Sequence, residues 1–284
     1  MSALASVRWQ RLLRRVVVAV AILAVLIIWG WLNLRGIFFR DALAYWRPHF
    51  ADLYGDREVG VASTYLYSPA FAHLMWLPGL LPWPVFVALF SALNLVALVW
   101  MAGPVVGALL LLIPFSPVID EVTTGNIHLL LGAGVVLGFR WPAAWAFHLL
   151  TKVTPGVGVL YFAGRREWRS LGVALGVTVG LAFLSFALAP SAWFEWIDTL
   201  QRSAEVAVPD RIAAIPGPLW ARVAVAAVVA VVAGLGGWRW LVPIAVVLAL
   251  PVPWSSGLSV LVACIPLGLA ALRGRAAAAS ARSA

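Results

Sequence analysis

Residues 141–164 read WPAAWAFHLLTKVTPGVGVLYFAG, an apolar stretch in which Lys152 is the one charged side chain. Lys152 is also the only lysine of the chain, since every other cation is an arginine. An ammonium group inside a membrane is energetically costly, so it normally has a partner or a function there. Lys152 is therefore a candidate anion-binding group, and the fold of this stretch decides what it can reach.

The composition identifies an integral membrane protein. The chain is 63% hydrophobic and only 11% charged, with a mean hydropathy of +0.98, and a soluble domain of this size could not bury so much apolar surface. We therefore predict an all-α, polytopic membrane bundle of about nine to eleven segments. The net charge of +9 comes from arginines at the ends of apolar runs, which indicates membrane orientation and excludes nucleic acid as the expected partner.

The distribution of charge predicts one membrane domain with short flanking segments. The Arg-rich N-terminus should stay cytoplasmic, Val16–Leu34 should be a retained signal anchor, and the membrane should be the plasma or inner membrane. The polar stretch at residues 190–218 should form an amphipathic interfacial helix or an acceptor lid. The expected parts are a cytoplasmic segment at 1–15, a membrane domain at 16–272 with outer loops at about 35–64 and 190–218, and a cytoplasmic tail at 273–284.

The positions of arginines predict how residues 141–164 cross the membrane. If Arg140 and Arg165 both face the cytoplasm, Trp141–Gly164 forms a hairpin of two half-helices with its tip near Lys152–Pro155. Each half has about ten residues, roughly 15 Å long, which is too short to cross alone. The alternative is a single continuous helix with Arg140 outside. We favour the hairpin, because Pro155-Gly156 would break the helix.

Asp41 lies in the first outer loop, just beyond the first membrane helix, in the run Arg40-Asp41-Ala42-Leu43-Ala44-Tyr45. A carboxylate at this place could accept a proton from a hydroxyl nucleophile. It could instead be a helix N-cap at an interfacial turn.

A polar break is expected at residues 120–126, followed by a helix that starts at Gly125-Asn126-Ile127-His128. Free N–H groups at a helix start favour phosphate, so Asn126 and His128 are candidate phosphate ligands. The alternative is a capped helix with one satisfied histidine.

Lys152 has His148 four residues earlier, on the same face of a helix, and a compact ammonium suits a phosphate oxygen. The alternative for Lys152 is an intramembrane ion pair with Asp120 or Glu121. Tyr67-Ser68-Pro69 could be a plain helix start with proline in the first turn.

These pieces occur in one order along the chain. They are an Asp just past the first helix (Asp41), a Tyr-x-Pro (Tyr67 to Pro69), a Gly-polar-x-polar helix start (Gly125 to His128), a Lys-x-x-Pro (Lys152 to Pro155) and an Arg-Arg-x-Trp (Arg165 to Trp168). The ordered set resembles glycosyltransferase family 87, the mannosyltransferases that use polyprenyl-phosphate mannose and adopt the C-type (GT-C) membrane fold. The resemblance covers about residues 10–240.

The resemblance implies roles for particular residues. Asp41 matches the catalytic aspartate of the family, and Asn126 and His128 stand at the Gln and the Asn of its Gly-Gln-x-Asn signature. Lys152 and Pro155 match its Lys-x-x-Pro. The resemblance implies that Asp41 is the base, and the residues expected to bind the donor phosphate are Lys152, Asn126, Arg40 and His128. The residues expected to contact substrate are Tyr45, Tyr67, Glu121 and His148.

The expected reaction is transfer of a hexose, mannose by the resemblance, from a polyprenyl-phosphate donor to a lipid or glycan acceptor at the outer face, with inversion. No cofactor and no obligatory metal are expected, because a lipid-phosphate donor carries no nucleotide diphosphate. Two other classes stay open on the residues alone. One is a transporter or lipid carrier with an intramembrane anion site, and the other is a non-catalytic GT-C scaffold.

Overall fold

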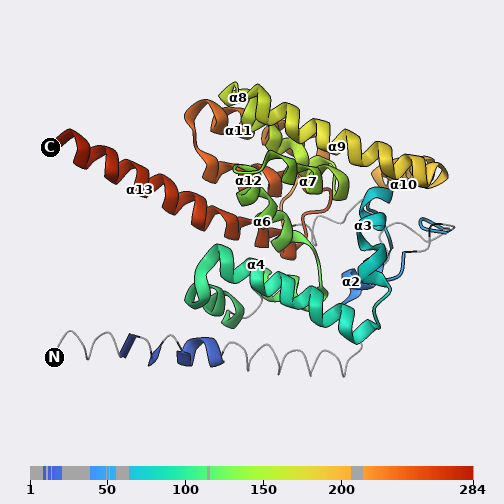
Figure 1. Cartoon of the computed structure of the whole chain (residues 1–284), viewed down its shortest axis with the longest axis horizontal. Coiled ribbons are helices and arrows are strands. Elements are labelled where there is room, and N and C mark those ends of the chain that lie inside the picture. Colours follow the sequence, from blue (N-terminus) through green and yellow to red (C-terminus); the bar gives the residue numbers. More distant parts are fainter. Residues whose placement is uncertain are drawn as a thin grey trace.

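The computed structural model describes residues 9–10, 12–13, 15–20, 39–48, 50, 52–55, 64–113, 116–205 and 214–283. Within these ranges the chain is helical and contains no strand, as Figure 1 shows. Most of the predicted signal anchor, Val16–Leu34, lies outside the described residues.

The helices follow one another with short connections. The α-helices are α2 (Arg40–Tyr45), α3 (Pro69–Gly79), α4 (Trp83–Leu112), α5 (Pro117–Thr124), α6 (His128–Gly138), α7 (Trp145–Thr151), α8 (Leu160–Arg165), α9 (Trp168–Leu188), α10 (Pro190–Glu205), α11 (Leu219–Gly236), α12 (Val242–Leu248) and α13 (Cys264–Ser283). The 3-10 helices of the described residues are η1 (Pro142–Ala144), η2 (Thr154–Val159), η3 (Arg239–Leu241) and η4 (Ser255–Ala263).

Four helical stretches of the described chain are long and apolar enough to cross a membrane. They are Trp83–Leu112, Trp168–Leu188, Leu219–Gly236 and Ser255–Ala281. The prediction of an all-α polytopic membrane protein is therefore confirmed. The expected number of nine to eleven segments stays a prediction, because other apolar helices are too short to be identified as membrane spans from their length alone.

The helix α4 consists of two helical arms that meet at a kink. It bends at Gly103, whose φ of 76° and ψ of 161° depart from helical geometry, a backbone conformation open to glycine. The two arms of α4 run along one side of the bundle below α6 in Figure 1.

The stretch 141–164 turns back on itself, as the hairpin prediction requires. The helix α7 ends at Thr151, Lys152 adopts a non-helical φ of −133°, and η2 then returns along α7. A Cβ built on Gly156 would lie 2.2 Å from Leu149 Cδ2, and one on Gly158 would lie 2.4 Å from Trp145 Cη2. Only glycine allows this close approach, so the two short halves pack directly and the turn presents Lys152 at its tip.

The polar break predicted at 120–126 lies between α4 and α6, and most of it forms the short helix α5. Ser116 caps this helix by accepting a hydrogen bond from Val118 N at 3.2 Å, and Pro117 fills the first position, where proline is favoured. Gly125 ends the helix in the left-handed conformation, with φ 67°. The polar stretch at residues 190–218 does contain an amphipathic helix, α10, while its predicted place at the membrane interface remains a prediction.

An aromatic core fixes the position of α2 against the bundle. The Tyr45 ring lies 5.1 Å from Tyr67 and 5.5 Å from both Phe71 and Phe90, measured between ring centroids. Tyr45 is fully buried, and rings at such spacings add to the burial energy. The short helix α2 is thereby held on α3 and α4.

Candidate active site

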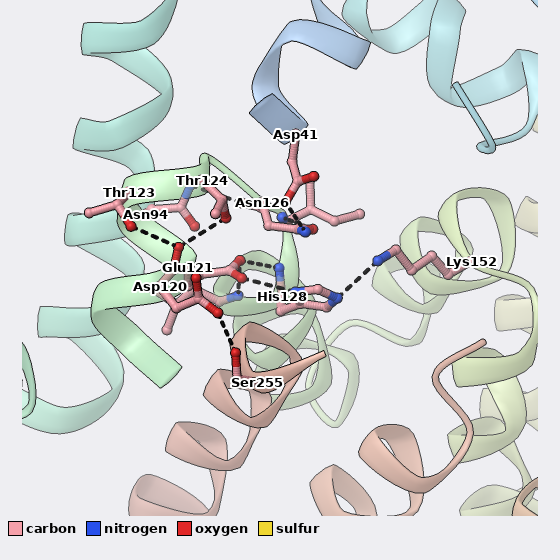
Figure 2. A network of polar contacts seen from close by, with 12 residues as sticks. Asp41, Asn94, Asp120, Glu121, Thr123, Thr124, Asn126, His128, Lys152 and Ser255 are labelled. Carbon is pink, nitrogen blue, oxygen red and sulfur yellow. Dashed lines mark hydrogen bonds and ion pairs between the residues drawn. The ribbon is translucent and has the colours of Figure 1, made fainter. Parts of the chain in front are cut away.

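Asp41 lies in the first turn of α2 and points toward the connection between α5 and α6 (Figure 2). Its Oδ2 accepts a hydrogen bond from Asn126 Nδ2 at 2.7 Å, and the side chain is half-buried. The alternative that Asp41 caps its own helix is wrong, because Phe39 is the N-cap residue and no side chain caps α2. The carboxylate is thus held by a residue 85 positions away in the sequence.

The end of α5 brings α2 to this place. Phe39 N donates to Thr123 O at 3.1 Å, and Gly125 lies directly against α2. A Cβ on Gly125 would lie 2.5 Å from Phe39 Cδ1 and 2.7 Å from Ala42 Cβ. Both the positive φ and the contact require glycine here.

Asn126 is the centre of the hydrogen bonds around Asp41. Its Oδ1 accepts from Ile127 N at 2.8 Å and from Tyr45 O–H at 3.4 Å, and Tyr45 shares a 2.9 Å hydrogen bond with Tyr67. Burial raises the pKa of the Tyr45 phenol well above its ordinary value, and Tyr67 and Asp41 add to the shift. The phenol therefore stays protonated and can donate to Asn126.

Glu121 occupies the start of α6, for which the sequence leaves two alternatives, a phosphate site and a capped helix. Its Oε1 accepts from the backbone N–H of His128 and, at 3.1 Å, from that of Leu129. Ile127, the N-cap residue, supplies no side-chain cap, and a carboxylate is favoured at a helix N-terminus. The first N–H groups of α6 therefore already have protein acceptors.

His128 joins Glu121 to Lys152. Its Nδ1 lies 2.9 Å from Glu121 Oε2, and its Nε2 lies 2.9 Å from Lys152 Nζ, as Figure 2 shows. The Lys152 ammonium also lies 5.6 Å from the centre of the Tyr67 ring, within the range of a cation–π contact.

The alternative of a direct ion pair between Lys152 and an acid is wrong, because His128 stands between Glu121 and the amine. Asp120 is hydrogen-bonded to the Ser255 hydroxyl instead.

Two predicted site residues do not join this network. Arg40 is exposed at the first position of α2, and its side chain makes no hydrogen bond or ion pair with the described residues. His148 is fully buried, and its Nε2 is hydrogen-bonded at 2.9 Å to Leu131 O, between α6 and α7. Its predicted substrate contact does not follow from this position, because the side chain packs into the hairpin instead.

One residue of the site was missed from the sequence. Asn94 lies fully buried in α4, and its Nδ2 donates to Asn126 O at 3.3 Å. A polar side chain inside an apolar segment is itself a functional signal, and that rule would have found Asn94. It steadies the backbone of the residue that holds Asp41.

Across the ranges described above, no group of three or more His, Cys, Asp or Glu side chains is arranged to hold a metal ion. The expectation of a metal-independent reaction thus remains a prediction.

The fold and this buried polar centre define a polytopic helical membrane protein with an acid and an amine gathered at one helix start. The family model for glycosyltransferase family 87 matches residues 65–283, so the chain belongs to that family and is a membrane glycosyltransferase. Comparison with curated proteins and with solved structures gave no match. The matched range holds Glu121, Asn126, His128 and Lys152, whereas Asp41 precedes it. It also includes the C-terminal helices that follow residue 240.

Proposed function

We propose that this protein transfers a hexose, mannose by family resemblance, from a polyprenyl-phosphate donor to a lipid or glycan acceptor at the outer face of the plasma or inner membrane. The N-terminus would be cytoplasmic. Asp41 takes the proton of the acceptor hydroxyl as its oxygen attacks the anomeric carbon. The bond from that carbon to the phosphate oxygen breaks, and its electron pair leaves with the lipid phosphate. Attack opposite the phosphate inverts the configuration, so a β-linked donor gives an α-glycoside.

The observation that carries the proposal is that two residues of one short turn hold the two reactive groups. Asn126 holds Asp41 at 2.7 Å, and His128 holds Lys152 at 2.9 Å. An acid and an ammonium are thus both fixed by residues of the same helix start. This arrangement suits a reaction in which the acid takes a proton from the acceptor hydroxyl while negative charge develops on the leaving phosphate near the ammonium.

The free hydrogen-bonding capacity on each side suits this chemistry. Asp41 Oδ2 accepts from Asn126, while Oδ1 has no hydrogen-bond partner among the described residues and can take a proton. An ammonium has three donors, and one of those on Lys152 faces His128. The other two can reach oxygens of the leaving phosphate.

In this proposal the phosphate meets Lys152 rather than the start of α6, whose N–H groups have acceptors in the protein. Glu121 and Asn126 already accept from the backbone N–H groups of residues 127–129. A second negative charge there would face the Glu121 carboxylate. Asn126 therefore orients Asp41 in this proposal, and no obligatory metal is expected.

The test is to incubate the purified protein in lipid nanodiscs with polyprenyl-phosphate sugars and candidate acceptors, and to follow product by mass spectrometry. Asp41→Asn should lower turnover by about 10² to 10⁴-fold, the usual contribution of a general base. Lys152→Met should lower it by about 10² to 10³-fold, because an anion-stabilising donor is lost.

The matched control is Arg275→Met, which removes an exposed charge far from these residues in the sequence and should leave turnover unchanged. An Asp41→Asn variant with full turnover would remove Asp41 as the base. Donor binding with neither transfer nor hydrolysis would favour a lipid carrier or a non-catalytic scaffold.

A further inference from the structure

Glu121 and His128 are both fully buried, and every hydrogen-bonding atom of their side chains has a partner within the protein. Glu121 Oε1 accepts from two backbone N–H groups, and its Oε2 faces His128 Nδ1. His128 Nε2 faces the Lys152 ammonium. Neither side chain retains a nitrogen or oxygen atom with which to bind a substrate.

With Glu121 ionised and Lys152 protonated, the donors and acceptors of this Glu121–His128–Lys152 chain of hydrogen bonds can be arranged in one way. A carboxylate accepts hydrogen bonds only, so the ring proton of His128 must be on Nδ1. The lone pair is then on Nε2, where it accepts an N–H from the ammonium of Lys152. Glu121 cannot rotate out of this arrangement, because its other oxygen caps α6.

We propose that Glu121 and His128 are positioning residues that act through Lys152 and do not touch the substrate. This inference rests on the proposed function, in which Lys152 meets the donor phosphate. It replaces the direct phosphate contact expected of His128 and the substrate contact expected of Glu121. The pair fixes one N–H of the ammonium and so directs the other two.

The position of Lys152 explains why its ammonium needs to be held by Glu121 and His128. Its side chain is a flexible four-carbon stem, and its backbone lies at the turn of the hairpin rather than within a helix. A group that stabilises charge must be fixed before the reaction, since reorientation during the reaction reduces its effect. A fully buried acceptor on α6 supplies the fixed point that the turn lacks.

Two substitutions of His128 separate its two hydrogen bonds. A glutamine amide extends about as far as Nε2, so His128→Gln keeps an acceptor for Lys152 and loses the donor to Glu121. An asparagine amide extends about as far as Nδ1, so His128→Asn keeps the donor to Glu121 and loses the acceptor.

We expect kcat of His128→Asn to be about ten- to hundredfold below that of His128→Gln, with a smaller change in KM, because a hydrogen bond to a charged group is lost. If His128 only maintained the helix start, the order would reverse. Equal kcat in the two variants, or a higher kcat for His128→Asn, overturns the proposal.

Glu121→Gln tests the tautomer. Its amide oxygen should stay on the two backbone N–H groups, which leaves the amide N–H facing Nδ1. The ring proton then moves to Nε2 and meets the N–H groups of Lys152, donor against donor. We expect kcat to fall by at least about tenfold while the melting temperature changes little, as expected when a histidine is held in the wrong tautomer. Wild-type kcat in a folded Glu121→Gln protein contradicts the inference.

The single lysine allows a readout that needs no sugar transfer. An amine-acylating reagent is added to the full-length protein in nanodiscs, and mass spectrometry follows the peptide that contains Lys152. His128→Asn and Glu121→Gln should label faster than wild type, because the amine is released, and His128→Gln should label at nearly the wild-type rate.

Equal labelling rates in all four proteins would show that the pair does not hold Lys152. If wild type transfers no sugar but the labelling differences appear, the proposed function fails and the pair still holds the amine. The two proposals can therefore fail separately.

Discussion

At the scale of single residues, the site depends on hydrogen bonds between side chains far apart in the sequence. Asn126 is the clearest case, because its amide nitrogen holds Asp41 while its amide oxygen caps Ile127 N and accepts from Tyr45. One side chain therefore fixes a helix start and the proposed base together. The carbonyl of the same residue is held by Asn94.

Asn126→Asp keeps the cap on Ile127 and replaces the N–H that faces Asp41 with a carboxylate oxygen. We expect turnover in the sugar-transfer assay to fall by about ten- to hundredfold, because a charge-assisted hydrogen bond is exchanged for repulsion. The melting temperature should move by only a few degrees, since the fold keeps its contacts. Unchanged turnover in this variant would mean that Asn126 does not orient Asp41.

At the scale of elements, short helices and tight turns bring the residues of the site together, while the long helices form the surrounding bundle. The helix α5 ends at Gly125, α6 begins at His128, and α2 packs on the junction between them. The hairpin of α7 and η2 then delivers Lys152 from the other side. Each of these elements is too short to be stable alone, so tertiary packing holds the site in place.

Gly125→Ala tests the junction between α2 and α5. The new Cβ would overlap Phe39 and Ala42 and would occupy a positive φ, so we expect a drop of several degrees in melting temperature and at least about tenfold lower turnover. Gly180→Ala in α9 is the matched control, because no atom lies within 4 Å of its Cβ position. The prediction fails if the two variants behave alike.

At the scale of the whole molecule, a buried arginine joins the C-terminal helices. Arg222, near the start of α11, donates to Leu248 O at 3.0 Å, Leu250 O at 2.8 Å and Pro251 O at 3.0 Å, and also to Gly217 O at 3.1 Å. Carbonyls at the end of a helix favour a cation. This contact ties the end of α12 to α11, beside which η2 of the hairpin also packs.

Arg222→Met should lower the free energy of unfolding by about 3 kcal/mol, because several buried carbonyls lose their donor. The measurement is thermal unfolding in detergent, followed by tryptophan fluorescence. Arg202→Met, which removes an exposed ion pair with Asp198, should change the melting temperature little. Similar losses in the two variants would assign Arg222 no special part in stability.

The sequence by itself determined the class of fold and two groups of the proposed site. Its hydropathy required membrane helices, Pro155 and the flanking arginines predicted the hairpin, and the ordered motifs singled out Asp41 and Lys152. These features are local, so the periodicity and position of a few neighbouring residues encode them. The helix α5 was missed because its polar face resembles a loop when its packing partners are unknown.

Only the tertiary structure decided which side chains meet. It placed Glu121 on the start of α6, His128 between Glu121 and Lys152, and Asn126 against Asp41. The same residues could have formed a direct ion pair or an open phosphate site, because hydrogen-bonding capacity is a property of the residue type and leaves the partner undefined. The partner is set by the packing of α2, α5, α6 and the hairpin, which lets Asp41 and Asn126 form a hydrogen bond although they are 85 residues apart.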